Sequence, residues 1–180
     1  MKVGIVGYGV VGKTRFHSIV KNTPYKVTAI SENNSIARKD IPKNIDVFED
    51  YQSLIEQSNV NIVFISLPNK FAANATVLSL KKGLHVFCEK PPAKTLAELK
   101  EVLLVSQQHP ELKLMYGFNH RFHHSVEEAK LIIQENSLGR LINMRGVYGK
   151  SQMISFNQSD WRTKREESGG GILLDQGIHM

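Results

Sequence analysis

Unbroken apolar runs alternate with helix-like patterns from the first residues to about residue 118. The runs place β-branched and aromatic residues on consecutive positions, which is typical of parallel strands buried on both faces. We therefore expect an α/β fold of Rossmann type, a doubly wound parallel sheet covered by helices. The expected strands cover residues 2–6, 25–31, 60–67, 85–88 and 113–117. The expected helices cover residues 10–21, 51–57, 70–82 and 95–108.

The pattern changes after this point, where a second region begins. A helix is expected over residues 122–135 and a strand over residues 141–148, before a polar loop that reaches residue 168. We assign residues 1–118 to a dinucleotide-binding Rossmann domain and residues 119–180 to the start of a second α/β domain.

From Gly171 the chain has the pattern of the first turns of a helix, but no glycine cap or charged tail closes that helix. We therefore expect a C-terminally truncated second domain. A sheet without its neighbouring strands leaves apolar side chains uncovered. Ile142, Met144 and Val147 are expected to be exposed for this reason.

The composition argues against disulfide-bonded, membrane-spanning and nucleic-acid-binding proteins. The 180 residues include a single cysteine, so no internal disulfide forms, and no apolar run approaches the roughly 20 residues needed to cross a bilayer. We expect a cytoplasmic protein without a membrane partner. The formal net charge of +6 would suit nucleic acid, but the lysines are spread over several helices and loops without interleaved aromatic residues. Nucleic acid is therefore not an expected partner.

The loop after the first expected strand indicates a ligand that carries phosphate. Gly7, Gly9 and Gly12 fit the dinucleotide pattern G-x-G-x-x-G. Gly7 and Gly12 with the following Lys-Thr also fit the G-x-x-x-x-G-K-T loop of nucleotide triphosphatases. In either case glycine lets the backbone approach a phosphate at a helix N-terminus. The dinucleotide site would comprise Gly7, Tyr8, Gly9, Val10, Val11 and Gly12.

An acidic residue about 20 positions after the loop favours the dinucleotide. Glu32 ends the second expected strand, where its carboxylate can accept hydrogen bonds from the adenosine ribose and repel a 2′-phosphate. It favours NAD over NADP, although Arg38 and Lys39 could soften that preference. A triphosphatase needs instead a carboxylate at the end of a later strand to hold magnesium. The strand before Pro68 ends without one.

Ligands of such a sheet bind at the carboxyl ends of the strands. Further cofactor contacts are therefore expected from residues that follow those ends: Ser66, Pro68, Asn69, Glu89 and Lys90. Lys90 stands between Glu89 and Pro91, and its ammonium group can stabilise a substrate alkoxide as hydride leaves. It is the first candidate catalytic residue.

Asp175 and His179 are four positions apart, a spacing that puts both on one face of a helix. A carboxylate beside an imidazole can orient the ring and raise its basicity, as a general base for an alcohol requires. Alone, this spacing is more often found on a solvated face. Gly169, Gly170 and Gly171 precede it, and three glycines allow another backbone or a flat cofactor to come close.

Five motifs follow one another along the whole chain. They are the glycine loop, Leu67-Pro68-Asn69, Cys88-Glu89-Lys90-Pro91, Gly117-Phe118-Asn119-His120-Arg121-Phe122 and the segment from Gly169 to His179. In this order and spacing they resemble the Gfo/Idh/MocA family of glucose-fructose oxidoreductases and inositol dehydrogenases. Most members of that family are NAD(P)-dependent oxidoreductases of sugars, inositols and related polyols, and their second domain forms a homo-oligomer interface.

The resemblance implies a role for each matching position. Lys90 would lie between nicotinamide and substrate, Asp175 would be its substrate-orienting partner, and His179 would be the acid/base. A cis peptide bond would precede Pro91. The substrate contacts would come from three residues: Arg121, Trp161 and Arg162. The chain departs from the family pattern at Ala72, where a histidine is usual, and in its short second domain.

Two other functions stay open at this stage. One is a non-catalytic module or sensor that binds NAD(H), because hydride transfer needs a dry, closed site that a truncated domain would not supply. The other is the triphosphatase, which would need Lys13 for magnesium-dependent nucleotide binding. A metal site is not expected, because His120, His123 and His124 crowd together without a cysteine or carboxylate to complete a coordination shell.

Overall fold

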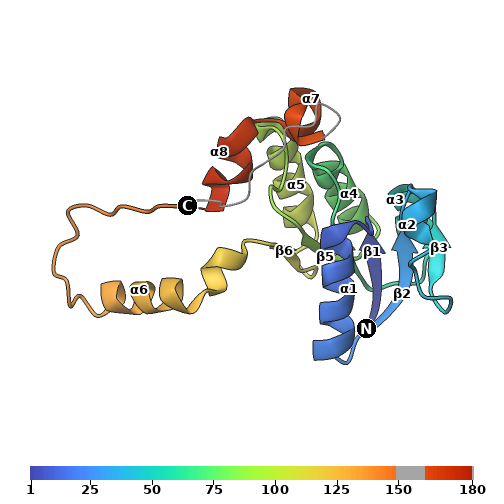
Figure 1. Cartoon of the computed structure of the whole chain (residues 1–180), viewed down its shortest axis with the longest axis horizontal. Helices are drawn as coiled ribbons and strands as arrows, with labels where there is room; N and C mark the ends of the chain where they lie inside the picture. Colours follow the sequence, from blue (N-terminus) through green and yellow to red (C-terminus); the bar gives the residue numbers. More distant parts are fainter. Residues whose placement is uncertain (149–160, 180) are drawn as a thin grey trace.

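The computed structural model describes residues 1–148 and 161–179 and confirms the expected α/β architecture. A six-stranded parallel sheet runs in the order β3-β2-β1-β4-β5-β6 (Figure 1). The strands are β1 (Lys2–Val6), β2 (Lys26–Ser31), β3 (Asp46–Phe48), β4 (Ile62–Ile65), β5 (His85–Cys88) and β6 (Leu114–Tyr116). The carboxyl ends of parallel strands meet at one edge of the sheet, and the strand order reverses between β1 and β4, which is where sheets of this kind bind their ligands.

Helices cover both faces of this sheet, and successive side chains of a strand point alternately toward one face and the other. Val3 and Ile5 of β1 pack with Ile19 on the side of α1 (Val10–Asn22). On the opposite side Val63 and Ile65 of β4 pack with residues of the other helices. These helices are α3 (Tyr51–Gln57), α4 (Asn69–Lys81) and α5 (Leu96–Gln108). The four helices expected within residues 1–118 are therefore present, with ends that differ by one residue at most.

Two short elements join the expected ones between β2 and α3. They are α2 (Ser35–Arg38), which Asn34 caps by accepting from the backbone N–H groups of Ile36 and Ala37, and the three-residue strand β3. The strand Asp46–Phe48 pairs with the end of β2 and extends the sheet by one strand. Glu32 N–H donates to Phe48 O at 3.0 Å, so this extra strand fixes the backbone where the expected ribose-binding carboxylate begins.

The second region starts with the 3-10 turn η1 (Asn119–Phe122) and α6 (His124–Gln134). Figure 1 shows that α6 projects away from the sheet and that the chain after it loops back; we call residues 124–148 the arm. The arm ends with the ring of Tyr148 in contact with His120, at 4.8 Å between centroids. The expected strand over residues 141–148 is wrong, because these residues form no strand. A strand needs a partner for its backbone groups, and no described strand lies beside the arm.

The exposure expected for the apolar residues of this segment is confirmed. The exposed fractions of Ile142, Met144 and Val147 are 95%, 82% and 81%. Residues 149–160, which include most of the expected polar loop, lie outside the described residues.

The last described segment returns to the sheet domain through α7 (Arg165–Ser168). The side-chain amide of Asn69, at the start of α4, donates to Ser168 O at 2.8 Å, and Lys94 Nζ donates to Glu166 O at 3.0 Å. Gly169 has a φ of +88°, and a Cβ there would lie 2.9 Å from Lys94 Cβ, so this close contact requires glycine. The docking of α7 places the residues after it at the carboxyl ends of the strands.

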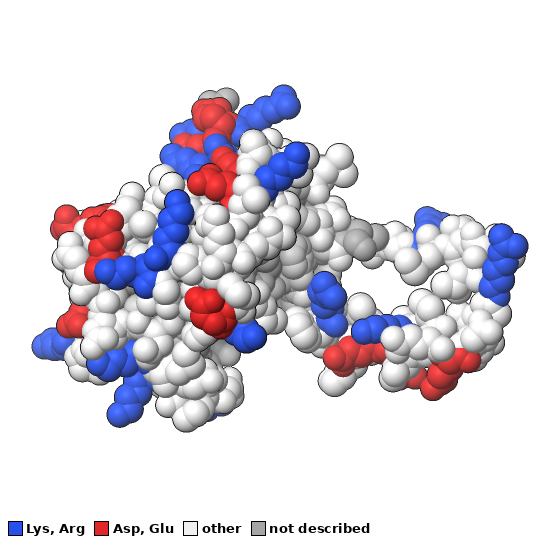
Figure 2. Space-filling view, turned by 180° about the vertical axis from the view of Figure 1, so that it is seen from behind, with Lys and Arg blue, Asp and Glu red and all other residues white. Residues whose placement is uncertain are grey.

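The surface carries both signs of charge. On the face shown in Figure 2, basic and acidic side chains are interspersed over the sheet domain and the arm. Within the described ranges, none of the helices combines the length and apolar character that crossing a membrane requires.

Candidate functional site

The glycine loop makes a sharp turn between β1 and α1 that side chains would block. Gly7 has a φ of +87°, and a Cβ on it would lie 2.6 Å from Ser66 O. A Cβ on Gly12 would lie 2.0 Å from Gly7 O, which is an impossible approach. These two glycines are therefore required by the packing of strand against helix.

Gly9 differs from the other two, because a Cβ there would meet no atom within 4 Å. It is the N-cap of α1, its φ of −69° is open to any residue, and no side chain caps the helix. Val10 and Val11 in the first turn are exposed. The packing of the chain does not explain a glycine here, whereas close approach of a diphosphate to the free N–H groups of a helix does.

Glu32 lies directly beside this loop at the end of β2. Its Oε2 accepts from Tyr8 N–H at 2.8 Å and its Oε1 accepts from Asn34 N–H at 2.9 Å. Each carboxylate oxygen has a further lone pair. The half-buried carboxylate is therefore fixed in orientation and still able to accept a ribose hydroxyl.

Lys13 bears on the triphosphatase interpretation, because it would have to reach a phosphate. Its ammonium group is paired with Asp40 instead and lies 5.8 Å from the centre of the Tyr8 ring. At the end of β4 the chain runs through Ser66, not through a carboxylate. Both observations favour the dinucleotide interpretation.

The residues after β4 contribute one polar group without a partner. Ser66 Oγ is buried and has no hydrogen-bond partner among the described residues, so it is available to a ligand at the strand ends. Pro68 is the N-cap of α4, and the amide of Asn69 is used in the bond to Ser168. Cofactor contact by these three residues stays a prediction.

Glu89, after β5, is held by α1. Its Oε1 accepts from Arg15 Nε at 2.6 Å, and the guanidinium lies 5.0 Å from the centre of the Phe87 ring. A Cβ on Gly117 would lie 2.8 Å from Glu89 Oε2, so the absence of a side chain there leaves room for the carboxylate. Sequence reasoning did not identify Arg15, because its partner is 74 positions away in the chain.

Lys90 and Asp175 meet at the same edge, although 85 positions separate them. Lys90 Nζ donates to Asp175 Oδ1 at 2.8 Å and to Asp175 O at 2.9 Å. Burial raises the pKa of Asp175, but hydrogen bonds from Lys90 and Gln176 outweigh it, so the net pKa is lowered. Asp175 is thus an anion that fixes the ammonium group. The peptide bond between Lys90 and Pro91 is cis, as expected.

His179 reaches this edge from a different element than expected. The helix α8 (Gly171–Asp175) stops at Gln176, and His179 ends the 3-10 turn η3 (Gly177–His179). The expectation that Asp175 and His179 share one face of a single helix is therefore wrong. The change of helix type turns His179 toward η1, where it lines a cavity of about 370 Å³ with Phe118, His120, Arg121 and Ile178.

The imidazole of His179 favours its neutral form. Its Nδ1 is buried and has no hydrogen-bond partner among the described residues. Burial lowers the pKa of His179, and the positive charges of Lys90 and a protonated His120 lower it further. A neutral imidazole beside an ammonium group can accept a proton from a hydroxyl that the ammonium group polarises.

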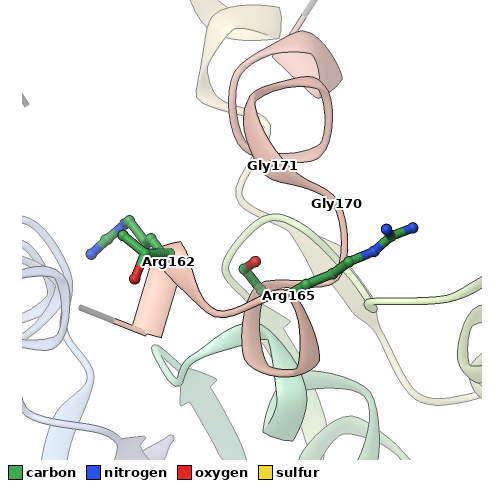
Figure 3. A pocket seen from close by; sticks show the side chains of 6 residues that line it. Arg162, Arg165, Gly170 and Gly171 are labelled. Carbon is green, nitrogen blue, oxygen red and sulfur yellow. The ribbon is translucent and has the colours of Figure 1, made fainter. Parts of the chain in front are cut away.

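Two of the three expected substrate residues line separate cavities. Arg121 lines the cavity of His179. Trp161 and Arg162 lie on η2 (Trp161–Thr163), where the guanidinium of Arg162 is 4.6 Å from the centre of the Trp161 ring. Arg162 lines a second cavity of about 380 Å³ with Thr163, Arg165, Ser168, Gly170 and Gly171. Figure 3 shows the side chains of Arg162 and Arg165 pointing in opposite directions, so they do not form one anion clamp.

Two family profiles match this chain. Residues 1–118 match a profile described as an oxidoreductase family with an NAD-binding Rossmann fold, and residues 126–180 match one described as a Gfo/Idh/MocA C-terminal domain.

Among curated relatives, levoglucosan dehydrogenase of Pseudarthrobacter phenanthrenivorans is 30% identical over 132 residues, which cover 73% of this chain and 34% of that protein. Among solved structures, a levoglucosan dehydrogenase in complex with NADH and levoglucosan is 27% identical with a TM-score of 0.84, and the match covers 99% of this chain and 51% of that one. The scyllo-inositol dehydrogenase from Lactobacillus casei with bound NAD(H) and scyllo-inositol is 30% identical with a TM-score of 0.71, over 77% and 42% of the two chains. The chain spans about half the length, or less, of these relatives.

Proposed function

The chain belongs to the Gfo/Idh/MocA oxidoreductase family, whose first domain is an NAD-binding Rossmann fold, and from this premise we propose that it serves an NAD(P)-dependent dehydrogenase of sugars or polyols. The observation that carries the proposal is the meeting of Lys90, Asp175 and His179 at the edge of the sheet that also carries the glycine loop. We propose residues 1–118 as the cofactor domain and residues 119–180 as part of the substrate domain.

The residues of the chain would act in a fixed order. Asp175 holds the ammonium group of Lys90, which then faces the substrate oxygen and stabilises the negative charge that develops on it. His179, neutral because its pKa is lowered, takes the proton of the hydroxyl. Bound NAD would supply the acceptor for the hydride. The open backbone at Gly9 and the hydroxyl of Ser66 fit the diphosphate of such a cofactor, and the Glu32 carboxylate fits as an acceptor for its ribose hydroxyls.

The proposal also covers the choice between NAD and NADP, the substrate contacts and the oligomeric state. Glu32, fixed beside the loop, supports NAD over NADP because its charge opposes a 2′-phosphate. Arg121, Trp161 and Arg162 are proposed substrate contacts. We also infer a cytoplasmic protein, and we propose that it assembles into a homo-oligomer, as the family resemblance implies.

The test is oxidation of a panel of sugars and inositols with NAD, followed by the absorbance of NADH. Lys90→Met keeps the length of the side chain and removes the charge, so it should lower kcat by a factor on the order of a hundred while NADH binding is kept. The control is Lys100→Met, an exposed lysine on α5. Equal turnover by the two variants would contradict the role of Lys90, and NADH binding without turnover on any substrate would favour a non-catalytic NAD(H)-binding module.

A further inference from the structure

His120 lies directly against the proposed acid/base residue. The ring centroids of His120 and His179 are 4.4 Å apart and the planes are inclined by 31°, so the two rings are in close, tilted contact. Both rings line the same cavity of about 370 Å³. His120 belongs to η1, which follows β6, so two separate parts of the chain bring the two imidazoles together.

The ring of His120 is held on its other sides by aromatic neighbours. Tyr148 approaches it edge-on, with centroids 4.8 Å apart, and His123 lies at 5.1 Å. Such contacts favour one orientation of the ring. Among the described residues no group of three or more histidine, cysteine, aspartate or glutamate side chains is arranged to hold a metal ion.

The charges around His179 determine how the contact with His120 affects protonation of the His179 ring. The ring centroids are close enough that a positive charge on His120 disfavours a second positive charge on His179. The cation Lys90 acts in the same direction as a protonated His120, whereas the anion Asp175 opposes both. The other polar or titratable groups that line the cavity or contact the two rings are Arg121, His123 and Tyr148.

We propose that His120 is a positioning residue for His179: its ring packs against the imidazole and disfavours a second positive charge there, which keeps His179 ready to accept the hydroxyl proton. The inference rests on the proposed acid/base role of His179. It gives His120 a function that neither the metal hypothesis nor the cofactor site assigns.

The contact between His120 and His179 predicts the direction in which the pKa of His179 changes when His120 is replaced. A neutral His179 is the active form in alcohol oxidation, and that form is lost as the pH falls through the pKa of His179. Removing the charge of His120 removes one cause that lowers this pKa, so His179 would become protonated at a higher pH. The acid limb of kcat/KM would move to higher pH in the same variant.

The test is an NMR titration of the His179 ring protons in the wild type and in His120→Phe, which keeps an aromatic ring and removes the charge. The matched control is His124→Phe, the same change at an exposed position on α6. We expect the pKa of His179 to rise in His120→Phe and to stay unchanged in His124→Phe. An unchanged pKa in His120→Phe would overturn the proposal, as would an equal rise in both variants.

A second variant keeps the result interpretable. His120→Gln should raise the pKa of His179 in the same way, because it also removes the charge; a rise with phenylalanine alone would indicate altered packing and would overturn the electrostatic argument. The titration does not depend on activity. If the pKa rises but no sugar or polyol is oxidised, the pairing stands and the dehydrogenase proposal fails; turnover with an unshifted acid limb in His120→Phe would contradict the positioning role alone.

Discussion

At the scale of single residues, the charge of Glu32 is placed by the backbone rather than by a counter-ion. Tyr8 and Asn34 donate their N–H groups to its two oxygens. The carboxylate is therefore held in one orientation beside the loop, and we expect it to discriminate between the riboses of NAD and NADP.

Glu32→Gln should change cofactor preference, because the side chain keeps its size and loses its charge. We expect the ratio of the dissociation constants for NADPH and NADH to fall about tenfold, which corresponds to about 1.4 kcal/mol. Parallel titrations with both cofactors measure this ratio, with the exposed Glu56→Gln as control. A ratio that stays the same in Glu32→Gln would mean that another residue selects the cofactor.

At the scale of elements, the long apolar strands and the four helices around them follow from periodicity alone. β3 could not be foreseen, because the three residues Asp46–Phe48 are too few to show a period and depend on pairing with β2. The strand expected over residues 141–148 has the right side-chain pattern but no neighbouring strand among the described residues. The pattern of apolar residues shows which face of a strand can be buried. A strand also needs a neighbouring strand for its backbone hydrogen bonds, and the pattern does not reveal one.

In the candidate site, too, features set by neighbouring residues could be predicted, whereas contacts between residues far apart in the chain could not. The glycine loop, Glu32 and Lys90 could be recognised because each lies at the end of a strand with a clear local signal. The break of helix at Gln176 was not visible in the spacing of Asp175 and His179, and it decides that His179 meets His120. Arg15 and His120 were missed as partners, since their contacts join residues far apart in the chain.

The start of α5 is fixed by side chains of its own first turn, and this can be tested by mutation. Thr95 Oγ1 accepts from Glu98 N–H at 3.2 Å and Glu98 Oε2 accepts from Thr95 N–H at 3.3 Å, which is a capping box. Thr95→Ala should lower the free energy of unfolding by about 1 kcal/mol, because an N–H group of the first turn loses its acceptor. Urea denaturation measures this. Thr95→Ser keeps the acceptor and should unfold like the wild type; an equal loss in both variants would assign the effect to the methyl group.

At the scale of the whole molecule, the sheet domain and the arm differ in how they bury apolar surface. The sheet domain encloses two clusters of buried side chains, one on each face. The arm presents Ile142, Met144 and Val147 to solvent. Contiguous exposed apolar residues favour association with another surface.

We therefore expect the chain to self-associate through the arm as its concentration rises. Replacing Ile142, Met144 and Val147 by lysine should suppress this association without changing the free energy of unfolding of the sheet domain, since these side chains pack against no core. Sedimentation velocity over a range of concentrations measures it. Ile36→Lys alters an exposed apolar residue on α2 and should have no effect; association that survives the triple substitution would place the contact elsewhere.

The central claim is that the glycine loop binds a dinucleotide at the edge where Lys90, Asp175 and His179 meet. The most direct measurement is a fluorescence titration with NADH of the wild type and of Gly9→Ala. A Cβ at Gly9 meets no protein atom within 4 Å, so the variant should keep its melting temperature while the methyl group obstructs the diphosphate. We predict saturable binding by the wild type and a dissociation constant at least about tenfold higher for Gly9→Ala. A folded wild type that does not bind NADH, or equal affinity in both proteins, would contradict the account.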